Sequence, residues 1–237
     1  YRRQRQMCIR DRAYIPDEPF YFLQADTLEM MRYFRGMYES FDEKMFYRLQ
    51  EFFPGIDMKR NIRRLSKGMQ KQVAFWLALC CRPKLLILDE PLDGLDPVMR
   101  KQIWTILMSE VAERRTTVLV SSHNLRELED ICDHVGLLHR GGILFSRDLD
   151  DMKLGMYKMQ CIFPNPLPDS AWEGFDILHK EQRGSLYTIT ARGSREELLA
   201  RVNALNPTFC EMLPLTLEEI FINETEVAGY DVKKLLF

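Results

Sequence analysis

Two adjacent acidic residues, Asp89 and Glu90, directly follow a run of four apolar residues, Leu85–Leu88. The run predicts a buried strand of a parallel sheet with both carboxylates at its C-terminal end. Ligands of open α/β sheets bind at that edge. There, one carboxylate can hold Mg²⁺ through water and the next can orient or deprotonate an attacking water. The alternative interpretation is a strand that ends in a solvated acidic turn.

A second candidate site lies at the start of a helix predicted over Met69–Cys81, which Ser66 and Gly68 precede. Ser66 can cap this helix, and the first N–H groups and the positive end of the helix dipole can then receive a phosphate. A serine in this position, taken alone, more often serves only as a cap.

His123 is a third candidate, because it follows a strand predicted over Thr117–Ser121. A lone histidine after a strand is usually structural. At the same sheet edge as Asp89 and Glu90, however, its imidazole could contact the terminal phosphate of a nucleotide.

In their order and spacing, these three segments together resemble the nucleotide-binding domain of ATP-binding-cassette (ABC) proteins. Leu65–Gln72 resembles the ABC signature, with Lys67 and Met69 where the commonest form has Gly and Gln. Leu85–Glu90 resembles the Walker B strand, and His123 resembles the switch histidine.

Two further segments fit the same family: Leu95 and Asp96 resemble the D-loop, and Tyr14–Pro19 resembles the Q-loop. Asp17 stands at the position of the usual glutamine of the Q-loop. An aspartate there can still accept hydrogen bonds, but it departs from the family pattern.

The resemblance implies a role for four residues at the ATP molecule that this subunit itself would bind. Asp89 would hold Mg²⁺ through water, and Asp17 would contact the same ion and its water. Glu90 would polarise the attacking water. His123 would contact the γ-phosphate and sense its presence.

The resemblance also implies a second ATP, because ABC domains sandwich two ATP molecules head to tail. The signature residues would bind the γ-phosphate of the ATP held by a partner subunit, either an identical copy or a related ABC ATPase. Asp96 would lie at the dimer interface and couple the two sites. The signature residues concerned are Ser66, Lys67, Gly68 and Met69.

The P-loop pattern Gly-x-x-x-x-Gly-Lys-Ser/Thr occurs nowhere in the 237 residues, which contain no Gly-Lys pair. Residues 1–12 hold five arginines, and Met7–Arg12 resembles the translation of sequencing-adapter DNA. We therefore expect a non-native scar over residues 1–12 and a gene truncated by assembly, with native sequence from Ala13. A basic tail that binds RNA or anionic lipid is the alternative.

Composition favours a cytosolic globular protein. The chain is 46% hydrophobic and 29% charged, and its net charge of −2 gives no electrostatic case for nucleic-acid binding. The longest apolar run, Val73–Cys81, is far shorter than the roughly twenty residues of a membrane-spanning helix. The family implies a cytoplasmic subunit, peripheral on the inner face of the cell membrane, that powers a separate transmembrane permease.

Two other functions stay open. A soluble ABC ATPase of the chromosome-maintenance or translation-factor type would show a long coiled-coil insertion or a second cassette. Only 48 positions separate Asp17 from Leu65, and no second signature follows, so transport is favoured. The other alternative is that the protein lacks a P-loop, as the sequence does, and is a degenerate cassette that binds partners without hydrolysing ATP.

The predicted fold class is α/β: a partial ABC-type P-loop ATPase domain over residues 13–152 and a small α+β accessory or regulatory domain over residues 153–237. The ATPase part combines a helical signature subdomain with a mostly parallel sheet. The aromatic-rich region at residues 20–38 is interpreted as a helical core or as the groove that receives a permease helix. Helices are predicted over residues 26–53, 98–114, 125–134, 194–205 and 215–221, and further strands over residues 135–139, 143–145, 157–163, 175–180 and 185–191.

Overall fold

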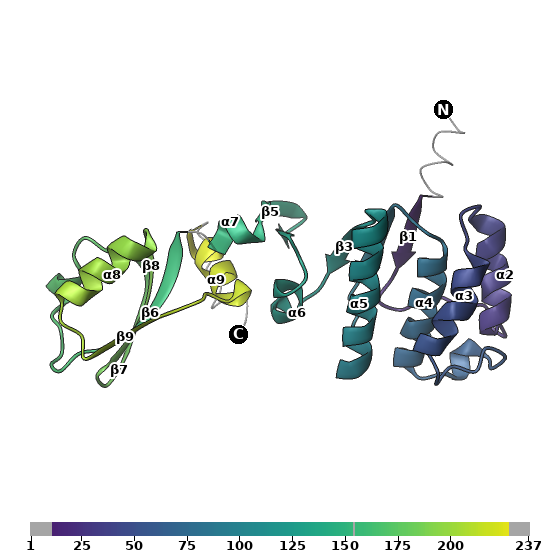
Figure 1. Ribbon diagram of the computed structural model, residues 1–237, viewed down its shortest axis with the longest axis horizontal. Coiled ribbons are helices and arrows are strands. Elements are labelled where there is room, and N and C mark those ends of the chain that lie inside the picture. Colours follow the sequence, from purple (N-terminus) through teal and green to yellow (C-terminus); the bar gives the residue numbers. More distant parts are fainter. Residues whose placement is uncertain (1–10, 154, 228–237) are drawn as a thin grey trace, which may run out of the picture. The chain divides into compact units, whose positions relative to one another are not determined.

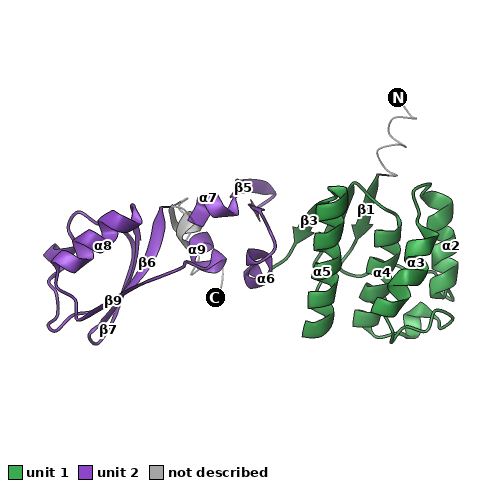
Figure 2. Ribbon diagram, viewed as in Figure 1, with its two compact units in different colours: residues 1–123 green, residues 124–237 purple. Residues whose placement is uncertain are grey.

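The computed structural model describes residues 11–153 and 155–227, and the chain divides into two compact units, residues 1–123 and 124–237 (Figure 1, Figure 2). Most of the predicted scar lies outside the described residues, although Arg12 is the first residue of a strand. The domain boundary predicted at residues 152/153 lies inside the second unit and stays a prediction.

A parallel three-stranded sheet forms the centre of unit 1, in the order β1 (Arg12–Ile15), β2 (Leu85–Asp89), β3 (Thr117–Ser121). Leu86 and Leu88 are each 1% exposed, whereas Leu85 and Ile87 are half-buried, so one face of the middle strand is fully covered. The register pairs Asp89 with Ser121. The predicted parallel arrangement is confirmed.

Residues 26–53 form two helices and not one, α2 (Thr27–Met37) and α3 (Glu43–Leu49). The backbone turns to an extended conformation at Tyr38. Asp42 then caps α3 by accepting a 2.8 Å hydrogen bond from the Met45 N–H. An N-cap aspartate requires non-helical backbone, so the chain breaks before it.

Helix α4 (Lys67–Cys80) contacts β1, α2 and α3 (Figure 1). It carries Trp76, the largest fully buried side chain among the described residues. The Trp76 ring stacks on Phe46 at a centroid distance of 4.7 Å, and its indole N–H donates to the Phe46 carbonyl at 2.7 Å. Each such buried ring stabilises the fold by about 1.5–3 kcal/mol. Helix α5 (Pro97–Arg114) and short 3₁₀ helices at Gln50–Phe52 and Ile62–Arg64 complete the unit.

Unit 2 begins with α6 (Leu125–Glu129), which is half as long as predicted because the chain leaves the helix at Asp130. A hairpin of β4 (His134–His139) and β5 (Gly142–Asp148) follows. Its two turn residues, Arg140 and Gly141, both have positive φ, which matches the right-handed twist of the strands.

The rest of unit 2 is a four-stranded antiparallel sheet in the order β7-β8-β6-β9, with Met159 and Ile189 fully buried in its core. The sequence pattern does not predict β9. No helix among the described residues has the length and apolar character to cross a membrane. The remaining elements are α7 (Leu149–Lys153), β6 (Met156–Ile162), β7 (Asp176–Arg183), β8 (Leu186–Arg192), α8 (Arg195–Ala204), β9 (Phe209–Leu213), α9 (Leu217–Val227) and a 3₁₀ helix at Asp169–Trp172.

Candidate active site

Asp89 ends β2 with both carboxylate oxygens in hydrogen bonds. Its Oδ1 accepts from the Ser121 hydroxyl at 2.5 Å, and its Oδ2 accepts from the Tyr14 hydroxyl at 3.3 Å. Desolvation, and then the negative charge of Asp89, raise the pKa of Tyr14. Both donors come from the ends of the neighbouring strands. Ser121 and Tyr14 were not among the predicted site residues, and aligning the C-terminal ends of the three strands could have found them.

Glu90 adopts a left-handed backbone conformation, with φ at +43°. Such a conformation costs a residue other than glycine about 1–3 kcal/mol and persists only where the surroundings hold it. The shortest hydrogen bonds of the Glu90 N–H and carbonyl come from Ser121 and Lys71, and two longer ones, to the Ser121 hydroxyl at 3.3 Å and from the Asp93 N–H at 3.4 Å, accompany them. The Glu90 N–H donates to the Ser121 carbonyl at 3.1 Å, and the Glu90 carbonyl accepts from Lys71 Nζ at 2.6 Å.

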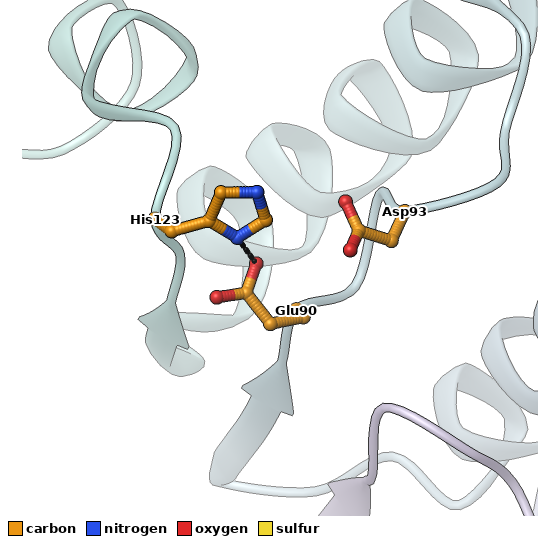
Figure 3. A group of neighbouring side chains, drawn as sticks. All are labelled: Glu90, Asp93 and His123. Carbon is orange, nitrogen blue, oxygen red and sulfur yellow. Dashed lines mark ion pairs between the residues drawn. The ribbon is translucent and has the colours of Figure 1, made fainter. Parts of the chain in front are cut away.

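The Glu90 side chain points toward His123, and its Oε2 lies 2.9 Å from His123 Nδ1 (Figure 3). The carboxylate is 25% exposed and the imidazole 73% exposed, so water has access to the pair. A carboxylate and an imidazole in contact can take up and hold a proton from a water that attacks a phosphorus centre. The structure therefore brings together two residues that are 33 positions apart in sequence.

Asp93 lies beside this pair and was not predicted from the sequence (Figure 3). One ligand atom from each of Glu90, Asp93 and His123 lies within 4.8 Å of the others, which is close enough to hold a cation. The metal ligands expected from the sequence, Asp89 and Asp17, do not belong to this group. Asp89 does fit Mg²⁺ bound through water, because its hydrogen-bond donors are neutral hydroxyl groups that leave its charge uncompensated.

The signature residues lie at the start of α4. Ser66 is the N-cap and accepts a 3.2 Å hydrogen bond from the Met69 N–H. A Cβ atom at Gly68 would come within 2.5 Å of the Gly94 carbonyl oxygen. The lack of a side chain at Gly68 thus lets the start of α4 approach the turn that follows Glu90. Lys67 is exposed and only 3.4 Å from Glu18.

Two other predicted site residues make contacts within the chain. Asp96 is the N-cap of α5, since its Oδ1 accepts hydrogen bonds from the N–H groups of Val98 and Met99, both at 3.0 Å. Asp17 pairs with Lys71 at 3.0 Å. The roles expected for both residues toward ATP stay predictions.

Comparison with known proteins gives one family match and many relatives. The family described as "AAA domain, putative AbiEii toxin, Type IV TA system" matches residues 16–129. The ABC transporter ATP-binding protein YtrB of Bacillus subtilis is 32% identical over 209 residues, which are 88% of this chain and 71% of YtrB.

Two further relatives have transport in their names. The bacitracin transport ATP-binding protein BcrA of Bacillus licheniformis is 39% identical over 41% of this chain and 32% of its own length. The lantibiotic transport ATP-binding protein SrtF of Streptococcus pyogenes is 34% identical over 46% of this chain and 45% of its own. The chain thus spans less than half the length of both.

Solved structures agree with the sequence relatives. An ATP-binding subunit of an ABC transporter superposes with a TM-score of 0.57 and 27% identity, over 64% of this chain and 65% of that one. CbiO1 of Clostridium perfringens, part of the complex cbiONQ, shares the fold with a TM-score of 0.51 and 23% identity, over 64% of this chain and 62% of its own.

Proposed function

Because this chain belongs to the ATP-binding proteins of ABC transporters, we propose that Glu90, His123 and Asp89 hydrolyse ATP to drive transport through a separate membrane permease. The observation that carries this proposal is the contact between Glu90 and His123 beside Asp89, at the C-terminal edge of a parallel sheet. A phosphoryl-transfer site requires mainly positioned charge and an oriented water, which these residues can supply.

In the proposed reaction, Glu90 orients a water molecule toward the γ-phosphorus of ATP. A bond forms between the water oxygen and phosphorus as the bond to the ADP oxygen breaks. The Glu90–His123 pair takes up the proton that the water loses. Mg²⁺, when bound, neutralises charge on the phosphates, and Asp89 is the residue that would hold it through water, with Asp17 as the second candidate.

We propose that the signature residues Ser66, Lys67, Gly68 and Met69 act on a second ATP, held by the partner subunit in a head-to-tail dimer. The start of a capped 14-residue helix offers N–H groups and a positive dipole end to a γ-phosphate. Asp96 would then lie at the dimer interface. The partner is either a second copy of this chain or a related ABC ATPase.

An exposed aromatic surface on unit 1 supports docking to a permease. Phe20 is 73% exposed and packs edge to face on Phe22, which packs in the same way on Tyr33 of α2. Leu23 is 74% exposed beside them. Contiguous apolar side chains of this kind mark interaction surfaces. The subunit would thus sit peripherally at the cytoplasmic face of the membrane. The ending Thr216–Phe221 resembles the tails of ABC ATPases that serve two-component exporters, and it favours a transporter of the exporter type.

The test is ATP turnover by the complete gene product with Glu90→Gln. We expect hydrolysis to fall by at least about 10²-fold while ATP binding persists, because the amide cannot accept the proton from water. ATP-bound dimers should accumulate and be visible by size-exclusion chromatography. Glu113→Gln, an exposed glutamate on α5, is the matched control and should behave as wild type. Unchanged turnover by Glu90→Gln would refute the assignment.

A further inference from the structure

Lys71 is a buried lysine in the second turn of α4, with a side chain only 6% exposed. Its ammonium group lies 3.0 Å from Asp17 Oδ1 and 2.6 Å from the Glu90 carbonyl oxygen. A buried ammonium group is strongly destabilising unless it is paired and hydrogen-bonded. These two partners come from segments 54 and 19 positions away in sequence. Lys71 therefore ties three separate segments together at one point.

The contact with Glu90 bears on the geometry of the proposed catalytic carboxylate. Glu90 is held in a left-handed conformation by Ser121 on the N–H side and by Lys71 on the carbonyl side. Without the lysine, the Glu90 carbonyl loses its charged donor and keeps only the longer 3.4 Å hydrogen bond from the Asp93 N–H, which opposes relaxation of the strained backbone less strongly. A rotation of this peptide would move the carboxylate relative to His123.

We propose that Lys71 is a positioning residue for ATP hydrolysis, which holds Glu90 in its working conformation and connects it to Asp17 and to α4. The proposal rests on the function proposed above. Because α4 begins at the signature residues, Lys71 lies one helical turn from Gly68. A shift of α4 on binding the partner's ATP would reach the Glu90 carbonyl through Lys71. The same residue would thus link the two ATP sites of the dimer.

The first test measures kcat and KM for ATP in the complete gene product. Lys71→Met keeps the buried stem but removes the charge and donors, and kcat should fall about 100-fold while KM changes less than about threefold. Lys71→Arg, which keeps charge and donors, should restore kcat to within about tenfold of wild type. Lys180→Met removes a Lys–Asp ion pair of unit 2 and should leave both constants unchanged.

Asp17→Asn provides a second variant in case Lys71→Met folds poorly. It leaves the bond from Lys71 to the Glu90 carbonyl in place, so kcat should fall less than about tenfold. The double variant Asp17→Asn/Lys71→Met should lose less kcat than the product of the two single losses, because both changes remove the same Lys71–Asp17 contact. Additive losses, or full activity of Lys71→Met, would overturn the proposal.

A second readout needs no nucleotide and uses the 237-residue chain. Amide hydrogen exchange over Glu90–Asp93 should speed up about tenfold in Lys71→Met, while amides of α3 keep their wild-type rates. If the wild-type protein fails to hydrolyse ATP, the proposed function fails, and exchange alone decides whether Lys71 holds the Glu90 peptide. Unchanged exchange at Glu90 contradicts the proposal whatever the ATPase result.

Discussion

Hydrogen bonds from neighbouring residues hold the two acidic residues of this site, Asp89 and Glu90, in place. Asp89 receives two hydroxyl donors, and Glu90 receives His123 at its side chain and Lys71 at its carbonyl. The backbone of Glu90 is strained, which the contacts around it must offset. We infer that reactivity at this edge depends on the pairing between Glu90 and His123 as much as on either residue alone.

His123→Ala in the complete gene product tests that pairing. Loss of the imidazole removes a proton partner of Glu90, and kcat should fall by about 10²–10⁴-fold. The measurement is steady-state phosphate release, with nucleotide binding followed separately. His134→Ala is the matched control, since His134 contacts the Ser146 hydroxyl in unit 2. Equal kcat values for the two variants would argue against a role for His123.

At the scale of elements, close contacts at both ends of α4 connect it to neighbouring segments: the turn at Gly94 at its start and α3 at its end. At the start, Gly68 approaches the Gly94 carbonyl more closely than any side chain would allow. At the end, Arg82 donates two hydrogen bonds to Asp42, the N-cap of α3, at 2.6 and 3.1 Å. These joints fix the helix that carries the signature residues.

Gly68→Ala should destabilise unit 1 by about 1–3 kcal/mol, because the new methyl group meets backbone that cannot move aside cheaply. Gly36→Ala is the matched control on α2. Nothing lies within 4 Å of a Cβ there, and the exchange should stabilise by about 0.5–1 kcal/mol. Urea unfolding of the two variants measures the free energy of unfolding, which should decrease for Gly68→Ala and increase for Gly36→Ala. Equal stability of Gly68→Ala and wild type would contradict the close approach.

Asp42→Ala should reduce stability near neutral pH by about 1–3 kcal/mol, since it removes the cap of α3 and the partner of Arg82. Asp42→Asn keeps a capping oxygen but not the charge, and it should cost less. The Met45 N–H, and then Arg82, lower the pKa of Asp42 against the opposing effect of burial.

The pH dependence follows from this lowered pKa. The stability due to the Asp42 charge is fully present above the unfolded-state pKa of about 3.9 and is lost as pH falls through the lower folded-state pKa. The difference between wild type and Asp42→Asn should therefore be constant from neutral pH down to about pH 5 and narrow below it. Urea unfolding across this range measures the difference. A stability difference between wild type and Asp42→Asn that increases in acid would contradict the lowered pKa of Asp42.

For the whole molecule, the residues with a proposed catalytic or ATP-binding role all lie in unit 1. Unit 2 contains a two-stranded and a four-stranded antiparallel sheet, and the four-stranded sheet has its own core. The 237 residues contain no Gly-Lys pair and thus no P-loop. ATP would contact Asp89, Glu90 and His123 without the cradle of N–H groups and the lysine that bind its phosphates.

We therefore expect no measurable ATP turnover by the 237-residue polypeptide. The measurement is phosphate release with excess Mg-ATP, compared with the complete gene product under the same conditions. Turnover by the polypeptide that Glu90→Gln abolishes would contradict this expectation.

The sequence by itself determined the family and most of the elements, although not the break within residues 26–53, the short α6 or β9. Local patterns such as the apolar run before Asp89 and the cap before Val98 act over a few residues. The strand predicted from the run at 85–88 and the helix predicted at 98–114 therefore match the structure to within about a residue. The order and spacing of the motifs identified the ABC ATPases.

Only the tertiary structure decided how those elements meet. The left-handed backbone of Glu90 and the contacts of Lys71 depend on groups far apart in sequence. No local pattern encodes such contacts, because each requires packed helices and strands to bring its partners within hydrogen-bond distance. For the same reason, the structure shows why Gly68 has no side chain, while the sequence shows only that it has none.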